Sequence, residues 1–384
     1  MNLRRSGNGS ALSPLALEGK ATAEREILDE PSFKRMISLE RKRTERSGNP
    51  FLLMLVDMGE HPLSAKTSKT LGQIQAALAI TTRETDVTGW YKQEAIVGVM
   101  FTDIGVEGKA TILSTLISRV SETLRSQLTL EQFNRVSISF HVYPEEWDHD
   151  SPQRPSNPAL YPDLSKRDEV RKSFRAMKRA MDVAGSLLAL IVLAPIFLVI
   201  AIAIKLTSKG PVLFRQPRVG QHGASFTFLK FRSMHVNNDA SRHKEFVTKL
   251  IAGRAEQRPA NGNGEVVYKL TNDSRITPVG AFLRKTSLDE LPQFLNVLKG
   301  EMSLVGPRPA IAYEVEAYDT WHRRRVLEAK PGITGLWQIC GRSRVKFDDM
   351  VRLDLRYARN WTPWLDLQIL MRTPRAVVTG TGAL

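Results

Sequence analysis

Two adjacent carboxylates, Asp289 and Glu290, are the residues with the clearest capacity for chemistry in this sequence. Thr286 or Ser287 can cap the N-terminus of a helix, which would place both acids in its first turn. Unpaired backbone amides and the helix dipole favour negative charge there, so we expect both carboxylates to be ionised. Ser287 and Glu290 also have the spacing of a capping box, so the pattern by itself is equally compatible with a plain helix start.

Basic residues lie on both sides of this acidic pair. Arg284 and Lys285 precede it, and Arg308 follows between the two prolines of the segment Gly-Pro-Arg-Pro at residues 306–309. The prolines restrict the backbone around Arg308, and a planar guanidinium can grip two oxygens of one phosphate. The spacing therefore predicts a site for a phosphorylated substrate, with a solvated arginine in a surface turn as the alternative for Arg308.

Three segments carry a resemblance to a known family: TSLDELPQ at residues 286–293, NVLKGEMSLVGPRP at 296–309 and PGITGLWQ at 331–338. They resemble the bacterial sugar transferases, the monotopic phosphoglycosyl transferases that start glycan assembly on polyprenyl phosphate. The resemblance extends from about residue 178 to the C-terminus. It implies transfer of a sugar 1-phosphate from a UDP-sugar to polyprenyl (undecaprenyl) phosphate with release of UMP, as the initiating step of exopolysaccharide or other glycan assembly.

The resemblance also implies roles for the acidic pair. Asp289 would be the nucleophile, forming a covalent aspartyl phosphosugar and contacting Mg2+, and Glu290 would be its base or supporting group. A carboxylate nucleophile beside a metal ion divides a difficult displacement between two anions into two steps. Adjacent helical residues diverge by about 100°, so the two carboxylates must point in different directions, and their division of labour stays open.

Further basic residues extend the predicted phosphate site. Residues 211–216 and 226–232 have the pattern of a β-hairpin, and alternation on its second strand points Lys230 and Arg232 to one face. The matching family motif places these two residues near the active site, whereas a solvated strand face is the alternative. Arg275, in a turn-forming segment, is another candidate phosphate ligand, with an ion pair to Asp273 as its alternative.

Composition limits the classes of partner. The 384 residues, with a net charge of +15 and a pI near 10.0, are enough for two domains and require an anionic partner. The single cysteine, Cys340, excludes an intrachain disulfide and a cysteine-based zinc cluster. The resemblance implies a UDP-sugar, polyprenyl phosphate and membrane lipids as partners. The apolar hairpin and the lack of a recognised nucleic-acid-binding motif argue against nucleic acid. A homodimer is compatible with catalysis at an interface.

Residues 31–147 have the pattern of an α/β sandwich. Short apolar runs at 51–56, 96–101 and 136–142 alternate with helical stretches near 71–82 and 109–128. Together with residues 83–86, the segment 89–95 resembles a diguanylate-cyclase-type (GGDEF) domain whose signature has degenerated. Lys92 and Gln93 cannot replace acidic metal ligands, so we expect no cyclase activity. Regulation, partner binding and a structural platform all remain open as roles of this domain.

An uncharged apolar run at residues 183–204 is long enough to span a bilayer. Pro195, after Ala194, would break it near its middle, and basic residues flank both ends, which marks both as cytoplasmic. We therefore expect a re-entrant hairpin at the cytoplasmic face of the bacterial inner membrane, with both domains cytoplasmic. The family often has serine in place of Ala194. Asp182, at the start of the run, is expected to pair with Lys178 or Arg179, or to be an ordinary interfacial charge.

The predicted organisation of the chain combines these elements. A disordered leader without an apolar signal segment (1–30) precedes the degenerate GGDEF-like α/β domain (31–147). A linker (148–170), an amphipathic segment leading into the re-entrant membrane helix (171–209) and a compact mixed α/β catalytic domain (210–384) follow. The fold class is thus α/β (α+β). A membrane-tethered regulatory or scaffold protein without catalysis is the alternative function.

Overall fold

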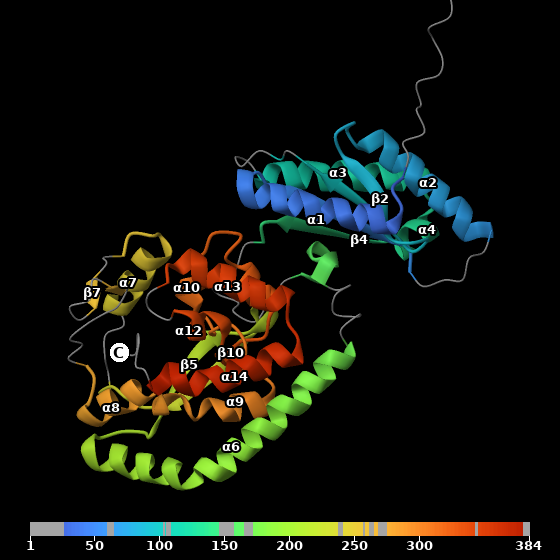
Figure 1. The fold of residues 1–384 in the computed structure, drawn as a ribbon. Helices are drawn as coiled ribbons and strands as arrows, with labels where there is room; N and C mark the ends of the chain where they lie inside the picture. Colours follow the sequence, from blue (N-terminus) through green and yellow to red (C-terminus); the bar gives the residue numbers. More distant parts are fainter. Residues whose placement is uncertain are drawn as a thin grey trace, which may run out of the picture. The chain divides into compact units, whose positions relative to one another are not determined.

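The computed structural model describes residues 27–59, 65–102, 104, 109–145, 157–164, 172–236, 241–255, 258–260, 265–267, 275–341 and 345–378. They fall into two compact units (Figure 1). The first comprises Met1–Ile37 and Asn49–Phe140, and the second comprises Ser38–Gly48 and His141–Leu384. Most of the predicted leader lies outside the described residues, as does the predicted linker except at 157–164.

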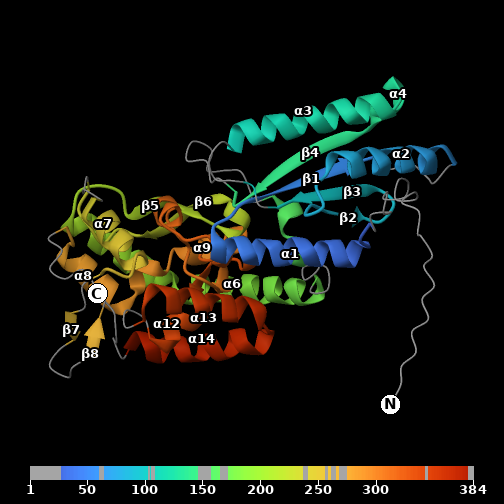
Figure 2. The same ribbon diagram turned by 90° about the horizontal axis from the view of Figure 1, so that it is seen from above.

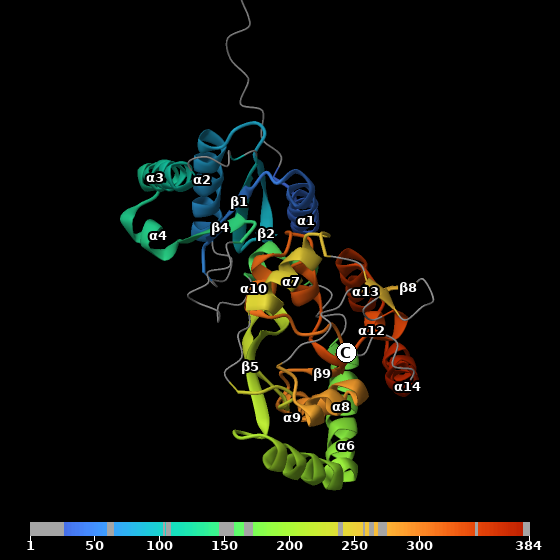
Figure 3. The same ribbon diagram turned by 90° about the vertical axis from the view of Figure 1, so that its left-hand side faces the viewer.

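The first unit is built on a four-stranded sheet in the order β2-β3-β1-β4. Antiparallel pairing of β1 with β3 places Leu53 opposite Met100, and β1 is buried along its length because both faces of the sheet are covered. Helix α1 covers one face and helices α2 and α3 cover the other (Figures 2 and 3). The predicted α/β sandwich is confirmed. The element bounds are α1 Glu30–Ser47, β1 Phe51–Asp57, α2 Ala65–Thr81, β2 Val87–Lys92, β3 Ile96–Phe101, α3 Lys109–Gln127, α4 Leu130–Arg135 and β4 Ser137–Tyr143.

One aromatic ring holds α1 against this sheet. A Cβ atom added to Gly89 or Gly98 would lie 2.5 Å or 2.3 Å from the side chain of Phe33, so only glycine leaves room for the ring. Residues 92–95, where the degenerate signature was predicted, form the tight turn of the β2–β3 hairpin, with Glu94 in the left-handed region at φ 58°. The side chains of Lys92 and Gln93 are exposed there.

The second unit is a mixture of short strands and helices around several small cores. The predicted hairpin is confirmed as β5 paired with β6, with Leu213 opposite Phe231. Strands β9 and β10 pair in parallel. The element bounds are η1 Pro158–Leu160, α6 Lys172–Thr207, β5 Leu213–Val219, η2 Gln221–Gly223, β6 Ser225–Phe231, α7 Ser241–Ile251, β7 Arg258–Ala260, β8 Glu265–Val267, α8 Pro278–Thr286, η3 Leu288–Glu290, α9 Gln293–Lys299, β9 Ser303–Val305, α10 Ala312–Glu316, α11 Arg324–Glu328, β10 Gly332–Thr334, α12 Leu336–Cys340, α13 Phe347–Arg359 and α14 Pro363–Val378.

Helix α6 is long and apolar enough to cross a membrane. It is one continuous 36-residue helix with Pro195 inside it, and its axis bends (Figures 1 and 3). Proline removes a helix hydrogen bond and crowds the preceding turn, which is a sufficient cause of the bend. Large apolar side chains on the helix are exposed: Leu187, Leu188, Ile191, Val192, Leu198, Val199 and Ile202.

Asp182 does not pair with a neighbouring basic residue of its own helix, so that prediction is wrong. The side chain is only 5% exposed, and its Oδ1 accepts hydrogen bonds from Ser303 Oγ and the Leu304 backbone amide, each at 2.9 Å. A carboxylate in this position satisfies buried donors at β9. The contact joins α6 to β9 within the second unit, a long-range contact that helical spacing could not reveal.

The two basic residues expected to meet Asp182 have other partners. Lys178 Nζ lies 2.6 Å from Asp366 Oδ2 and donates to the Val305 carbonyl at 3.1 Å. Arg179 donates at 2.6 Å to each of the carbonyls of Val297 and Leu298, at the C-terminal end of α9. The Gly300 amide also donates to the Val297 carbonyl, and the arginine adds its own hydrogen bonds at this helix end, so it helps to cap α9. The contacts of Lys178, Arg179 and Asp182 therefore attach the start of α6 to the rest of the second unit.

Candidate active site

The acidic pair lies in a 3-10 turn between two helices, not in the first turn of an α-helix. Helix α8 ends at Thr286, whose Oγ1 donates back to the Phe282 carbonyl at 2.8 Å. Ser287 turns the chain with φ 56° and caps nothing with its side chain, and α9 begins only after Pro292. The predicted capping role of Thr286 or Ser287 is therefore wrong. Figures 1 and 3 show α8 and α9, the helices that flank the turn, beside α6.

The two carboxylates differ in exposure, as the expected divergence of their side chains would produce. Asp289 is 7% exposed, whereas Glu290 is half-buried. In a 3-10 turn successive side chains are separated by about 120°. Burial raises the pKa of Asp289 to about 6 and repulsion from Glu290 adds to this, while Lys230 and Arg284 act in the opposite direction. At neutral pH Asp289 is thus mainly ionised, but burial rather than helix amides sets its pKa.

Lys230 on β6 is the central cation of the site. Burial lowers its pKa to about 8; Asp289 raises it, and Arg284, Arg218 and Arg308 lower it further. Each of these charges lies close enough to Lys230 to act on its pKa, so the structure gathers Asp289, Arg284, Arg218 and Arg308 around this amine. The amine also lies 5.3 Å from the centre of the Phe214 ring, the cross-strand partner of Lys230.

Arg308 is the one exposed residue in an otherwise buried segment, residues 302–310. The prolines are only part of what fixes this loop. Each carbonyl from residue 307 to 310 accepts a hydrogen bond, from Gly332 N, Arg325 Nη2, Arg218 Nη1 and Val219 N in that order, at 2.8, 3.4, 2.8 and 2.8 Å. A Cβ atom on Gly306 would lie 2.2 Å from the Lys330 carbonyl. The loop therefore presents Arg308 on a backbone held from several sides.

Arg218 on β5 belongs to the site and was missed in the sequence. Its guanidinium is 5% exposed, donates to Gln216 Oε1 and the Pro309 carbonyl, and lies 5.0 Å from the Phe228 ring centre. Burial, together with repulsion from Arg308, lowers its pKa to about 10. The strand pattern held a signal, because hairpin register places Arg218 on the same face as Lys230.

A second missed pair lies beside these arginines. His243 Nδ1 of α7 lies 2.7 Å from the Tyr313 hydroxyl of α10. Burial, with repulsion from Arg308, lowers the pKa of His243 to about 4, so the imidazole is neutral at physiological pH. Arg275 contributes to the same repulsion, which places it near this pair. Its alternative partner, Asp273, lies outside the described residues.

Arg232 departs from the prediction. Its guanidinium is 5% exposed and donates to the carbonyls of Ser208 and Lys209 and to Ser208 Oγ, at 2.7–2.9 Å. These groups follow the C-terminal end of α6, so Arg232 caps α6 instead of facing a phosphate. Arg232 lies one residue beyond the end of β6, next to the end of α6.

Asp289 and Glu290 are the carboxylates of the site that could hold a divalent cation. Among the described residues no group of three histidine, cysteine, aspartate or glutamate side chains is arranged to hold a metal ion. Magnesium is commonly held by one or two protein carboxylates together with substrate phosphates. Asp289 and Glu290, with cations nearby to bind those phosphates, fit that donor set.

Comparison with known proteins agrees with the segment that contains this site. Residues 173–380 match the family model for bacterial sugar transferases. The chain is 45% identical over 217 residues to the undecaprenyl-phosphate galactose phosphotransferase of Salmonella typhimurium, covering 56% of this chain and 43% of that protein. It is 41% identical over 206 residues to the exopolysaccharide production protein ExoY of Rhizobium meliloti, covering 54% and 87%. An uncharacterized sugar transferase of Haemophilus influenzae is 44% identical over 214 residues, covering 56% and 43%. The chain thus spans less than half the length of two of these three relatives.

Two solved structures are similar to about a third of this chain. A DGC protein from Thermotoga maritima is 20% identical, covering 33% of this chain and 90% of that one, with a TM-score of 0.26. The GGDEF domain of DgcB from Caulobacter crescentus, solved with c-di-GMP, is 10% identical, covering 35% and 80%, with a TM-score of 0.25. Scores this low support no functional argument, so the absence of cyclase activity stays a prediction.

Removing the charge of Asp289 should stabilise the protein. Because its pKa is about 6 in the folded state against an ordinary 3.8, ionisation opposes folding; this penalty is absent below pH 4 and complete above pH 6. Urea unfolding should show Asp289→Asn more stable than wild type at pH 7.5, by on the order of 2 kcal/mol, with little difference at pH 4. The partly exposed Asp349→Asn is the control. An equal difference at both pH values would contradict the assignment.

Proposed function

The chain belongs to the bacterial sugar transferase family, and on that premise we propose that it transfers a sugar 1-phosphate from a UDP-sugar to undecaprenyl phosphate. The products are UMP and a polyprenyl-diphosphate sugar, which initiates an exopolysaccharide or another glycan. Relatives named as undecaprenyl-phosphate galactose phosphotransferase and as exopolysaccharide production proteins support this reaction. The observation that carries the proposal is a buried carboxylate, Asp289, placed among cations that fit phosphates.

The proposed chemistry has two displacements at one phosphorus atom. A carboxylate oxygen of Asp289 attacks the β-phosphorus of the UDP-sugar, and the bond from that phosphorus to the bridging oxygen breaks, so that UMP leaves. An oxygen of undecaprenyl phosphate then attacks the aspartyl phosphosugar and displaces the carboxylate. Each step exchanges one P–O bond for another, and Asp289 is restored at the end.

The neighbouring cations account for how two anions can meet an ionised nucleophile. Lys230 and Arg284 act directly on the charge of Asp289, and Arg308 projects from its fixed loop towards solvent, available to an incoming phosphate. Preorganised cations stabilise charge as it shifts during phosphoryl transfer without reorganising themselves. Because the pKa of Asp289 is near 6, most of the carboxylate is ionised at pH 7. Its burial leaves it poorly solvated, which favours attack.

Mg2+ is proposed as the cofactor, held by Asp289 with Glu290 as the second carboxylate. When bound, it would neutralise charge on the diphosphate of the substrate. Glu290 is the more exposed of the two carboxylates. In this proposal Glu290 supports the metal ion, and Asp289 attacks the reacting phosphorus. The substrate phosphates would supply further ligands to the ion.

The proposed membrane arrangement is a re-entrant α6, with both domains on the cytoplasmic face of the bacterial inner membrane. The start of α6 is held by the contacts of Lys178, Arg179 and Asp182, and its end is capped by Arg232, all within one unit. A straight 36-residue helix would be about 54 Å long, so returning both ends to one compact unit favours a bend. The exposed apolar side chains would then lie in lipid, close to the polyprenyl substrate.

The first test is UMP release by full-length protein in lipid nanodiscs with Mg2+, undecaprenyl phosphate, and UDP-galactose or UDP-glucose. Wild type should release UMP in turnover amounts only when undecaprenyl phosphate is present. Asp289→Asn should lose activity by on the order of a thousandfold or more, as expected when a nucleophile is removed. Asp349→Asn is the matched control. Equal rates for wild type and Asp289→Asn would contradict the mechanism, and no release with any UDP-sugar would favour the scaffold alternative.

The pH dependence of this activity should identify Lys230. Below about pH 6 the rate should fall because Asp289 gains a proton, and above about pH 8 it should fall because Lys230 loses one. Arginine does not deprotonate in this range, so Lys230→Arg should have a lower maximal rate but retain it to pH 9.5 or beyond. Initial rates of UMP release from pH 5 to pH 10 test this. An alkaline decline unchanged in Lys230→Arg would show that another group causes it.

A further inference from the structure

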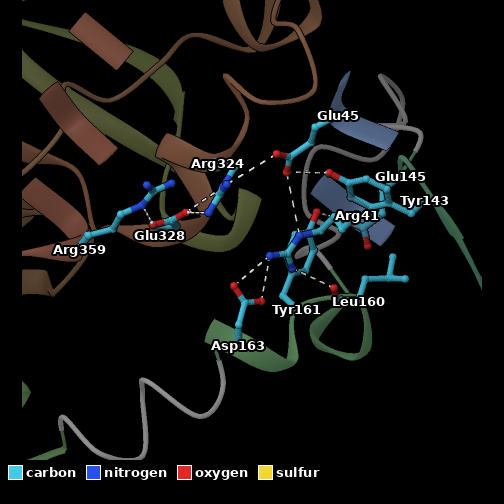
Figure 4. A network of polar contacts seen from close by, with 10 residues as sticks. All are labelled: Arg41, Glu45, Tyr143, Glu145, Leu160, Tyr161, Asp163, Arg324, Glu328 and Arg359. Carbon is cyan, nitrogen blue, oxygen red and sulfur yellow. Dashed lines mark hydrogen bonds and ion pairs between the residues drawn. The ribbon is translucent and has the colours of Figure 1, made fainter. Parts of the chain in front are cut away.

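The second half of α1 and the segment 157–164 form a buried polar network inside the second unit (Figure 4). Arg41 of α1 is 1% exposed; its Nη2 lies 2.9 Å from both carboxylate oxygens of Asp163, and its Nη1 donates to the Leu160 carbonyl at 3.0 Å. The guanidinium also lies 4.7 Å from the Tyr161 ring centre. A buried charge with this set of partners is costly to displace. Arg41 therefore fixes the position of α1 in this unit.

Glu45, one turn further along α1, reaches the transferase part of the unit. It accepts a hydrogen bond from the Tyr143 hydroxyl at 3.2 Å, and its Oε2 lies 3.6 Å from Arg324 Nη1 on α11. The side chains of Glu45 and Arg324 are only 8% and 14% exposed. Burial lowers the pKa of Arg324, but Glu328 and then Glu45 outweigh it and raise this pKa above its ordinary value. The contact between the two side chains is therefore poorly screened by solvent, unlike a surface ion pair.

Arg324 is also anchored on its own helix. Its Nε donates to Glu328 Oε1 at 2.8 Å, and Glu328 Oε2 lies 3.7 Å from Arg359 Nε on α13 (Figure 4). Glu45, Arg324, Glu328 and Arg359 thus form an alternating row of charges. Moving α1 would require α11 to move with it or would separate Glu45 from Arg324, although the carboxylate would keep Arg41 Nε of its own helix at 4.0 Å.

Arg325, the next residue of α11, contacts the loop that carries Arg308. Arg325 is 6% exposed, lies 2.7 Å from Asp354 Oδ2 on α13 and donates to the Tyr318 hydroxyl at 3.2 Å. Its Nη2 also donates to the backbone carbonyl of Arg308 at 3.4 Å. One five-residue helix therefore carries, on adjacent residues, the contact with α1 and a contact with the loop that presents Arg308.

We propose that Glu45 is a positioning residue for Arg308: it holds Arg324, and α11 transmits that position through Arg325 to the Arg308 loop. The proposal rests on the proposed function in assigning Arg308 to the diphosphate of the sugar nucleotide. It makes the end of α1 part of the support of the substrate site.

The test measures UDP affinity and UMP release separately in the full chain in nanodiscs. By isothermal titration calorimetry, Glu45→Gln and Arg324→Gln should each weaken UDP binding, on the order of fivefold. The double variant should bind no more weakly than Arg324→Gln alone. Glu40→Gln, on the same helix and paired with the exposed Arg43, is the matched control and should bind UDP as wild type does.

A combination with Arg308 separates positioning from a general loss of structure. Arg308→Lys removes the planar fork, so Glu45→Gln should weaken UDP binding no further in an Arg308→Lys background. Multiplicative effects of Glu45→Gln and Arg308→Lys, or an unchanged UDP affinity in Glu45→Gln, would overturn the proposal. Weakened, non-additive binding supports it even if wild type releases no UMP, a result that would count against the proposed function alone.

Discussion

Burial of a carboxylate is the constraint on which the site depends. A buried acid is costly in its charged form, and here the cost shows in the raised pKa of Asp289. Lys230 and Arg284 reduce that cost without removing it, since neither forms an ion pair close enough to neutralise the acid fully. The result is a carboxylate kept charged but poorly solvated, as the proposed nucleophile requires. The same cations then have the charge to bind two phosphorylated substrates.

The cations can serve in this way because the backbone beneath them is fixed. Four consecutive carbonyls, at residues 307–310, are bonded to donors from separate parts of the chain, two of them buried arginines. Arg218 and Arg325 thus use their charge to hold a loop, and Arg308 is left exposed on it. Burial thus distinguishes the two roles of arginine here: the buried Arg218 and Arg325 support the loop, and the exposed Arg308 is available to a substrate.

Much of the architecture could be predicted from the sequence, because local patterns determine it. Alternating apolar runs gave the sandwich and the β5–β6 hairpin, and alternation on that hairpin led to Lys230. The resemblance in three long segments led to Asp289 and Arg308. The errors concern contacts between distant segments. The left-handed Ser287 replaced a helix start with a 3-10 turn, Asp182 found its donors at β9, and Arg232 met the end of α6.

The residues that were missed have the same cause. His243 and Tyr313 are 70 positions apart, and nothing in either local pattern indicates that they meet. Glu45 and Arg324 are still further apart, and each would pass for a surface charge on a helix. Register could have found Arg218, because a hairpin with a known turn defines which residues share a face. Local periodicity therefore predicts elements and faces, but not which distant charge will lie against them.

The most direct measurement is mass spectrometry of peptides from protein incubated with UDP-galactose or UDP-glucose and Mg2+ in the absence of undecaprenyl phosphate. A covalent nucleophile should accumulate a hexose phosphate on Asp289, which should be lost on addition of undecaprenyl phosphate and absent from Asp289→Asn. An adduct on Glu290 instead, or turnover by wild type with no adduct on any residue under rapid quenching, would contradict the central role assigned to Asp289.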